Sequence, residues 1–235
     1  MLTAAGFDLD QTDRLLTTTR SVRRRLDLQR PVERDVVLDC LRIALQAPSG
    51  GNSQPWRWLV VDDPGVRGRL AELYRRGHDP YLAANRAAAQ QAGRTDVSRI
   101  LDSSQYLSDH LHQVPVLVIP CLLQRLPESA SVFDTAGFYG SIVPAVWSLM
   151  LALRSRGLGS AYTTLHLPNE RAAAELLGIP ETVTQVAMIP VAYYTGDDFK
   201  PAARRPVEQV VYVNSWRRKL DVDARPREQK RGPTP

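Results

Sequence analysis

Cysteine is scarce in this chain, with only Cys40 and Cys121 among 235 residues. Both lie in apolar segments, which favours buried free thiols in a reducing compartment over a disulfide framework. The sequence also lacks an uninterrupted apolar run near the roughly 20 residues that a membrane-spanning helix needs. Its opening residues, MLTAAGFDLDQTDRLL, contain early acids and have no basic start, unlike a secretory signal. We therefore expect a cytoplasmic protein without a membrane segment.

Common catalytic motifs are missing as well. No GxGxxG sequence opens a helix after a strand, and there is neither a P-loop nor zinc-ligand spacing. The four histidines are not spaced as a metal site, so we predict no metal; they are His78, His110, His112 and His166. No acid–base or nucleophile set is visible either. If the chain is an enzyme, we expect a bound cofactor rather than a side chain to carry the chemistry.

The chain has an excess of positive charge, with a net charge of +5 and a pI of about 9.5. Basic residues gather at 20–25, at 203–206 and in the stretch 217–235. Such charge suits nucleic acids or anionic small molecules. Aromatic residues do not interleave with the basic ones, so we expect no nucleic acid. Two clusters near the ends of one domain favour a shared anion, although a solvated basic face explains each cluster alone.

Helical and strand patterns are mixed along the chain, without an internal repeat. We predict helices over 10–19, 31–47, 66–74, 104–114, 138–159 and 169–180, and strands over 56–61, 115–123, 185–194 and 207–213. The helix over 138–159 is apolar nearly all the way round and should be central. The polar stretch 77–102 is interpreted as an excursion or lid. These patterns predict an α+β fold, with helices around a central mixed or antiparallel sheet. Residues 1–216 would form one domain, followed by a flexible basic tail over 217–235.

The most informative segment is APSGGNSQPW, residues 47–56. Its glycines allow the backbone to approach a flat ligand closely. Its serine, asparagine and glutamine side chains offer uncharged hydrogen-bonding groups. A glycine stop after a helix, followed by a polar turn, explains the same residues. Spacing alone favours the glycine stop and polar turn over a ligand-binding loop.

Four segments, in this order, resemble the nitroreductase family of flavoproteins: RSVRR, APSGGNSQPWRWLVV, GSIVPAVWSLMLALRSRGLGS and KPAARRPVEQVV. The resemblance covers roughly residues 13–216, and PSxxNSQPW is its most specific part. It implies an interlocked homodimer with one FMN in each of two clefts at the subunit interface. It also implies an NAD(P)H nitroreductase, in which NAD(P)H reduces FMN and a nitroaromatic or quinone acceptor is reduced next, in a ping-pong cycle.

The same resemblance implies roles for individual residues. The phosphate and ribityl chain would be held by Arg20, Ser21 and Arg23, and from the C-terminal side by Arg204, with Arg205 or Lys200. The flavin would be lined from a neighbouring subunit by Pro48, Ser49, Gly50 and Asn52, with Gln54 in support. Its ring edge would meet Thr163, Thr164, Leu165 and His166, and the substrate pocket would include Phe138 and Tyr139. Thr19 departs from the family, since many relatives have an arginine there, which leaves the details of the phosphate contacts open.

Other functions are compatible with the same residues. The chain could catalyse another flavin reaction, such as reductive dehalogenation, flavin destruction or enoate reduction. It could also bind or store flavin without turnover. NADPH is slightly favoured over NADH, because arginine-rich surfaces such as Arg75 and Arg76 suit the additional phosphate. The physiological acceptor stays open.

Overall fold

The computed structural model describes residues 6–95 and 97–220. The chain divides into two units, Met1–Phe199 and Lys200–Pro235, which are described separately below. The division falls before the predicted domain boundary at residue 216. The predicted tail lies largely outside the described residues.

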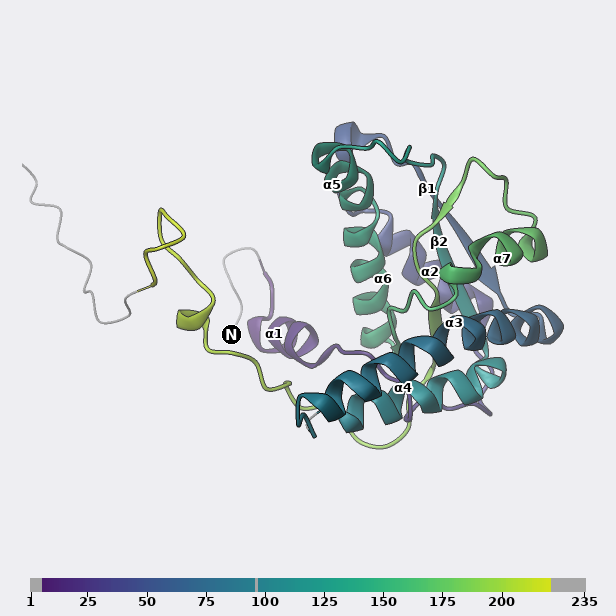
Figure 1. Ribbon diagram of the computed structural model, residues 1–235, viewed down its shortest axis with the longest axis horizontal. Helices are drawn as coiled ribbons and strands as arrows, with labels where there is room; N and C mark the ends of the chain where they lie inside the picture. Colours follow the sequence, from purple (N-terminus) through teal and green to yellow (C-terminus); the bar gives the residue numbers. More distant parts are fainter. Residues whose placement is uncertain (1–5, 96, 221–235) are drawn as a thin grey trace, which may run out of the picture. The chain divides into compact units, whose positions relative to one another are not determined.

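A five-stranded antiparallel sheet forms the centre of the first unit (Figure 1). Its strands are β1 (Trp56–Val61), β2 (Val116–Leu122), β3 (Leu158–Ser160), β4 (Thr184–Gln185) and β5 (Ile189–Tyr193). The order is β1-β2-β5-β3, and β4 also pairs with β2. The predicted α+β class is confirmed, as are the strands over 56–61 and 115–123.

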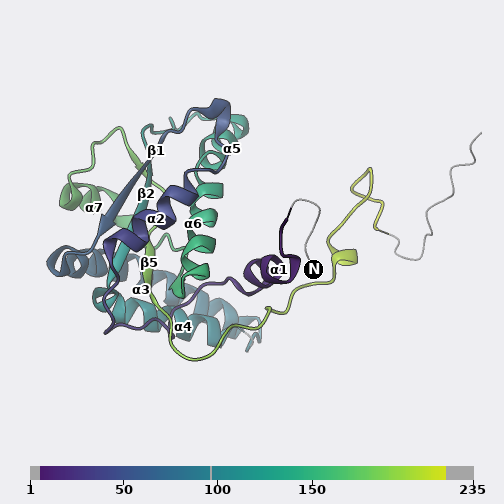
Figure 2. The same ribbon diagram turned by 180° about the vertical axis from the view of Figure 1, so that it is seen from behind.

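Seven α-helices surround the sheet in the described part of the chain. They are α1 (Leu9–Thr18), α2 (Arg34–Ala44), α3 (Pro64–Gln91), α4 (Ser98–His110), α5 (Val132–Gly140), α6 (Val143–Ser155) and α7 (Glu170–Leu177). Short 3-10 helices are η1 (Gly50–Asn52), η2 (Leu111–Gln113), η3 (Leu167–Asn169) and η4 (Val207–Gln209). Seen from behind, α2 lies alongside α6 (Figure 2).

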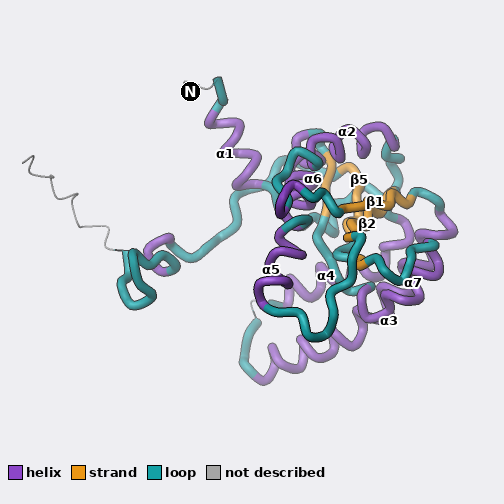
Figure 3. Tube along the Cα trace, turned by 90° about the horizontal axis from the view of Figure 1, so that it is seen from above, coloured by secondary structure: helices purple, strands orange, loops and turns teal. Residues whose placement is uncertain are grey.

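The two faces of β2 belong to two separate cores. Val116 and Val118 pack in the cluster that contains residues of α2 and α6. Leu117 and Ile119 pack in the cluster that contains residues of α3, α4 and α7. Successive side chains of a strand point to opposite faces, so an uninterrupted apolar strand separates two helical layers (Figure 3). The prediction that this strand is buried on both faces is confirmed.

The two cysteines lie in these cores. Both are free and buried, as predicted. Burial raises the pKa of the Cys121 thiol to about 12. Because the thiolate is the reactive form, Cys121 is an inert packing residue at neutral pH.

The stretch 77–102, interpreted from the sequence as an excursion or lid, is largely helical in the structure. Helix α3 continues through Gly77 and Pro80 as far as Gln91, and α4 begins at Ser98. A proline inside a helix lacks the N–H of one intrahelical bond, which is why the pattern indicated a stop. Burial of His78 and Leu82 on either side of Pro80 stabilises the helix there. The stretch therefore supplies the second half of α3 and the beginning of α4, and its role as a lid remains a prediction.

The predicted long helix over 138–159 is two helices with a break between them. Helix α5 ends at Gly140 and α6 begins at Val143, with Pro144 in its first turn. The combined stretch Val132–Ser155 is long and apolar enough to cross a membrane by length and composition, and 44% of its apolar 18-residue window is buried in the protein. Six residues of α6 are buried, as in a core helix.

The second unit contains little regular structure over its described residues, 200–220. The predicted strand over 207–213 is wrong, because Val207–Gln209 form a 3-10 helix instead. Tyr212 pairs with Lys219 in an isolated bridge, and its ring stacks on Trp216 with centroids 4.7 Å apart. Apolar residues at strand spacing thus form a small local turn rather than a strand of the sheet.

Candidate functional site

The loop between α2 and β1 has an unusual backbone. Gly51, Asn52 and Gln54 all have positive φ angles, of 56°, 53° and 46°. This left-handed region is uncommon for residues other than glycine, and such strain is found preferentially at functional sites. The loop therefore has a defined shape rather than that of a simple polar turn.

Hydrogen bonds within the loop and to the start of α6 hold that shape. The Gln54 N–H donates to the Ser49 hydroxyl over 3.1 Å, and the Gln54 side-chain amide donates to the Asn52 Oδ1 over 3.1 Å. The Gly50 N–H donates to the Ser141 hydroxyl over 3.1 Å. Part of the polar capacity predicted for a ligand is thus used by the loop itself. Pro48, Gly50, Asn52 and Gln54 nevertheless remain exposed, and Ser49 is half-buried.

The basic segment after α1 lies against the sheet. Ser21 forms a parallel bridge with Ser160 of β3, and the Val22 N–H donates to the Ser160 carbonyl over 2.8 Å. Arg20 and Arg23 are half-buried, whereas Ser21 is exposed. The side chain of Thr19 turns back to α1, since its hydroxyl donates to the Leu15 carbonyl over 2.6 Å. Thr19 therefore completes the C-terminal end of α1.

The segment that follows β3 carries the residues predicted at the flavin ring edge. Thr163 exchanges two backbone hydrogen bonds with Met188, at 3.2 and 2.7 Å. Its hydroxyl lies 3.0 Å from the hydroxyl of Tyr74 on α3. Thr164 is exposed and Leu165 is half-buried. Thr163 and the basic segment thus lie around the same short strand.

His166, the last residue of this predicted set, is turned inward. Its side chain is fully buried, and neither ring nitrogen has a hydrogen-bond partner among the described residues. Burial lowers the pKa of His166 to about 4, although Glu170 opposes the shift. The ring is therefore neutral at pH 7. Because it is covered in this chain, its predicted contact with a flavin would come from the backbone.

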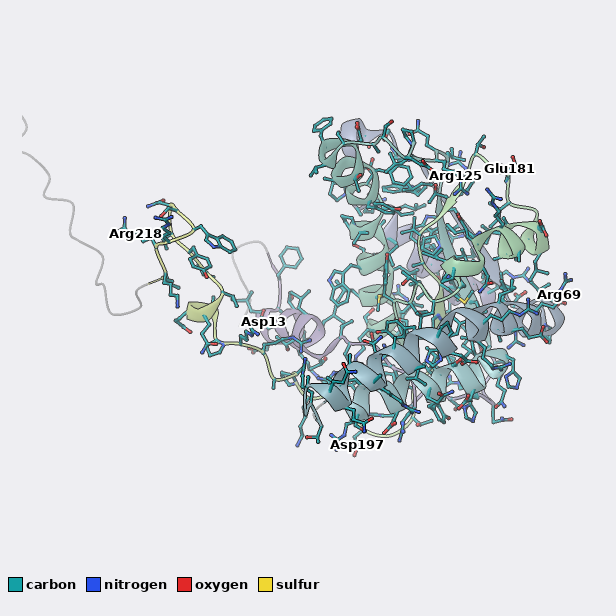
Figure 4. The ribbon with its side chains drawn as sticks, viewed as in Figure 1. Asp13, Arg69, Arg125, Glu181, Asp197 and Arg218 are labelled. Atoms are coloured by element: carbon teal, nitrogen blue, oxygen red, sulfur yellow. The ribbon has the colours of Figure 1, made fainter. Side chains whose placement is uncertain are left out.

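Glu170 at the start of α7 anchors this region. Its carboxylate accepts two hydrogen bonds from Arg125, at 3.0 and 3.1 Å. The Arg125 Nε donates to the Glu181 carbonyl over 2.9 Å, and Figure 4 shows these two side chains as neighbours. Burial raises the pKa of Glu170, but bonds from Arg125 and the Gln185 N–H outweigh it and leave a pKa below the ordinary value.

Glu170→Gln should therefore cost stability in a pH-dependent way. A hydrogen bond to a charged group contributes about 1.5–3 kcal/mol, so we expect a loss of that order at pH 7. A folded pKa below the unfolded value of 4.5 means that the pair stabilises the fold above that pH. The contribution is lost as the pH falls through the folded pKa. Urea unfolding of both proteins at several pH values measures this, and a loss that persists unchanged in acid would contradict it.

The two residues predicted for the substrate pocket lie on α5. Phe138 is half-buried and Tyr139 is exposed, and their rings meet edge to face with centroids 5.1 Å apart. Burial raises the pKa of Tyr162, and the Tyr139 phenol raises it further. The end of α5 therefore approaches the segment that carries Thr163.

Within the first unit, the predicted residues form two groups near opposite ends of α6. The loop at Gly50 is bonded to Ser141, just before α6 begins. The basic segment follows Thr18, whose hydroxyl accepts a 3.3 Å bond from Arg154 in the last turn of α6. Thirteen helical residues separate these ends by about 20 Å. Arg204 and Arg205 lie in the second unit, and their predicted role stays a prediction.

The chemistry of the basic segment and of the segment that carries Thr163 fits the phosphate and ring edge of an FMN. Residues 20–25 contain four arginines, one serine and no carboxylate. Guanidinium groups remain charged at any working pH and match phosphate geometry. Both backbone groups of Thr163 are bonded to Met188 and its hydroxyl meets Tyr74, so the exposed Thr164 is the residue of this segment that offers a hydroxyl to a ligand. The loop at Gly50 offers exposed polar backbone and side chains without charge, which suits a neutral heterocycle.

Four contacts of this region were not identified from the sequence. They are the hydroxyl of Tyr74 at Thr163, the close approach of Gly77 to Leu165, the bond of Ser141 to Gly50, and the Arg125–Glu170 pair. A glycine inside a helical pattern usually has a packing reason, so Gly77 was a usable signal. Asn169, which precedes α7, makes no side-chain capping bond and donates instead to the Leu73 carbonyl over 2.9 Å.

Comparison with known proteins identifies relatives over most of the chain. The family model described as "Nitroreductase family" matches residues 16–193. The iodotyrosine deiodinase of Thermotoga neapolitana is 29% identical over 202 residues, covering 86% of this chain and 97% of that protein. The 5,6-dimethylbenzimidazole synthase of Rhodospirillum rubrum is 30% identical over 185 residues, covering 78% of this chain and 82% of that protein.

Solved structures agree with the fold. An oxidised iodotyrosine deiodinase bound to FMN and 3-iodo-L-tyrosine superposes with a TM-score of 0.62 at 26% identity, covering 86% of this chain and 98% of that one. The FMN-dependent nitroreductase NfnB from Mycobacterium smegmatis, in complex with NADPH, gives a TM-score of 0.64 at 20% identity, covering 88% of this chain and 100% of that one.

Proposed function

The chain belongs to the nitroreductase family, and we propose that it is an FMN-dependent NAD(P)H oxidoreductase that reduces a small aromatic acceptor, such as a nitroaromatic or a quinone. The observation that carries the proposal is the basic segment at Arg20–Arg23, which is held against β3 beside Thr163. This arrangement places permanent positive charge next to uncharged hydrogen-bonding groups. A phosphorylated flavin presents the complementary pair of surfaces.

When bound, FMN would supply the hydride chemistry, and the residues of this chain would bind and orient it. Arg20, Ser21 and Arg23 would hold the phosphate. The segment from Thr163 to His166 would meet the ring edge, where hydrogen-bond donors favour the accumulation of negative charge on reduction. The open face would accept flat molecules one after another, and close stacking would be the main contribution to rate.

We propose further that the site is completed by a second copy of the chain. The loop at Gly50 lies about 20 Å along α6 from the basic segment, so a second copy would bring its own loop to the flavin. Apolar side chains that support such an interface are exposed on α5 and α6, namely Val132, Phe133, Val143 and Trp147. Sedimentation equilibrium should therefore give twice the 26.2 kDa of one chain. A monomer that binds FMN fully would contradict this arrangement.

Reductive dehalogenation is the second candidate. It is supported by the 29% identity to an iodotyrosine deiodinase over nearly the whole of that relative. The aromatic pair Phe138 and Tyr139, which we predict at the pocket, would suit a halogenated phenol as well as a nitroaromatic.

A panel of acceptors tests the proposal. Purified protein with FMN would be given NADPH or NADH and, in turn, a nitroaromatic, a quinone and 3-iodo-L-tyrosine. We expect NADPH to be oxidised faster with the nitroaromatic or the quinone than with 3-iodo-L-tyrosine. If iodide is released faster than either the nitroaromatic or the quinone is reduced, dehalogenation replaces the nitroreductase assignment. Failure to oxidise either nicotinamide nucleotide with any acceptor would contradict an oxidoreductase of this kind.

A further inference from the structure

A cavity of about 680 Å³ lies between α1 and the C-terminal end of α6. Small-molecule sites typically have volumes of about 300–1,000 Å³, so it is large enough for a metabolite. Its walls are polar and include Gln11, Thr12 and Thr18 of α1, Ser155 at the end of α6, and Tyr194 after β5. None of the described residues that line it belongs to the set predicted for FMN. Its own side chains therefore decide what it binds.

Two arginines of this cavity share one carboxylate. The Arg14 Nε donates to the Asp198 Oδ2 over 2.8 Å, and the Arg14 Nη2 donates to the same oxygen. The Arg154 Nη2 donates to the other oxygen, Oδ1. Bonds from Arg14, from the Phe199 N–H and from Arg154 hold the pKa of Asp198 well below its usual range, so the carboxylate is ionised at neutral pH. Two positive charges against one negative charge leave this cluster with a net charge of +1.

Arg154 is the more deeply buried of the two arginines. Its side chain is 11% exposed, against 68% for Arg14. Its Nη1 donates to the Tyr194 hydroxyl over 2.7 Å, and its Nη2 also donates to the Thr18 hydroxyl over 3.3 Å. Its Nε is buried and has no hydrogen-bond partner among the described residues. Because burying a cation costs free energy unless anions and acceptors surround it, this guanidinium favours further negative charge in the cavity.

A surface ion pair of the same chain shows what is unusual here. The Arg34 Nε and Nη2 donate to the Asp62 Oδ2 over 2.8 and 2.6 Å, the same pattern as between Arg14 and Asp198. Arg34 is also similarly exposed, at 64%. Within the described ranges, however, Arg34 alone forms an ion pair with Asp62. The second, buried arginine is therefore particular to the cluster at Asp198.

We propose that the cavity binds a small organic dicarboxylate, with one of its carboxylate groups held by Arg14 and Arg154 in place of Asp198. Planar guanidinium groups match carboxylates, and here two of them already bind one. Asp198 belongs to the irregular segment after β5, so its side chain can turn outward without unfolding a helix or strand. The two charges of a dicarboxylate would then balance the two arginines, whereas a monocarboxylate would leave one positive charge unbalanced.

Two uncharged side chains of the cavity suit the second carboxylate of this ligand. The Tyr194 hydroxyl accepts a bond from Arg154 and still has its own proton to donate. The Gln11 amide lines the cavity from an exposed position on α1 and has two N–H donors. Neither group changes the charge balance, so the ligand would be selected by charge and held at its far end by neutral donors.

Isothermal titration calorimetry with succinate tests the proposal on the full-length protein with one equivalent of FMN. We expect succinate to bind more tightly than propionate, which has only one carboxylate. Arg14→Gln should weaken succinate binding about tenfold, which corresponds to the loss of one hydrogen bond to a charged group. Arg34→Gln is the matched control, because it breaks the surface pair with Asp62 and should leave the dissociation constant unchanged.

Asp198→Asn provides a second, independent measurement. It removes the charge that competes with the ligand, so succinate should bind this variant about tenfold more tightly than the wild type. It also leaves the buried Arg154 without its carboxylate, so we expect a lower Tm. Succinate should raise that Tm more than it raises the Tm of the wild type, since tighter binding to the folded state stabilises it more.

The proposal is overturned if neither the wild type nor Asp198→Asn binds succinate, or if propionate binds as tightly as succinate. Equal affinities of Arg14→Gln and Arg34→Gln would also overturn it, and this comparison stays decisive if Asp198→Asn does not fold, because both arginines are exposed. Tighter binding of inorganic phosphate than of succinate would overturn the assignment to a carboxylate. None of these outcomes depends on reduction of FMN by NADPH, so the proposed function is tested separately.

Discussion

Gly77→Ala is expected to lower the free energy of unfolding by about 3 kcal/mol, a large fraction of the stability of a typical domain. The added Cβ atom would stand 2.0 Å from the Leu165 carbonyl oxygen, which is backbone and cannot swing aside. Either α3 or the segment after β3 would have to move. Urea unfolding followed by circular dichroism measures the effect.

Gly68→Ala is the matched control on the same helix. Among the described residues, and apart from the adjoining backbone of α3 itself, no atom would lie within 4 Å of a Cβ atom at Gly68. Alanine is the better helix former by about 1 kcal/mol, so this variant should be as stable as the wild type or slightly more stable. If both variants unfold at the same urea concentration, the close contact between α3 and the segment after β3 does not exist as described.

Arg23→Ala is expected to weaken FMN binding by about 10- to 150-fold, the range that corresponds to one hydrogen bond to a charged group. Arg23 is half-buried. Its charge acts to lower the pKa of Tyr74, whose hydroxyl contacts Thr163. Losing Arg23 would remove charge at the predicted phosphate position. Quenching of flavin fluorescence on binding gives the dissociation constant.

Arg24→Ala is the control for general loss of charge. Arg24 is exposed and lies outside the predicted phosphate set. An exposed charge is screened by salt, so its loss should leave the FMN dissociation constant nearly unchanged at physiological ionic strength. Equal losses in the two variants would mean that net charge, rather than a phosphate contact at Arg23, drives binding.

Strands β1 and β2 and most helices were predictable because their residues repeat at fixed spacing. Strand β3 (Leu158–Ser160) was not, because its first residues were assigned to the end of the helix predicted over 138–159. The strand over 115–123 has no polar interruption, and it is buried on both faces. The course of α3 was not predictable in this way. Gly77 and Pro80 are ordinary helix terminators. The helix continues because of tertiary contacts of Leu73, Tyr74 and Gly77 and the burial of residues on either side of Pro80.

The candidate site shows the same limit. Short motifs identified the loop at 47–56 and the basic segment at 20–25, because their composition is unusual. Tyr74 and Ser141 carry no such signal, since each is far in sequence from the residue that it holds. His166 was predicted from the family resemblance, as the last residue of the segment 163–166, yet burial turns its ring away from solvent. Local patterns do not encode which side of a loop faces inward.

The most direct test of the central claim is the visible absorbance spectrum of the purified protein with FMN, before and after anaerobic addition of NADPH. The proposed function predicts a bound flavin band that bleaches with NADPH and returns when an aromatic acceptor is added. A protein that is colourless and takes up no FMN would contradict the flavin site at Arg20–Arg23 and Thr163. A band that persists with both NADPH and NADH would contradict the proposed reaction instead.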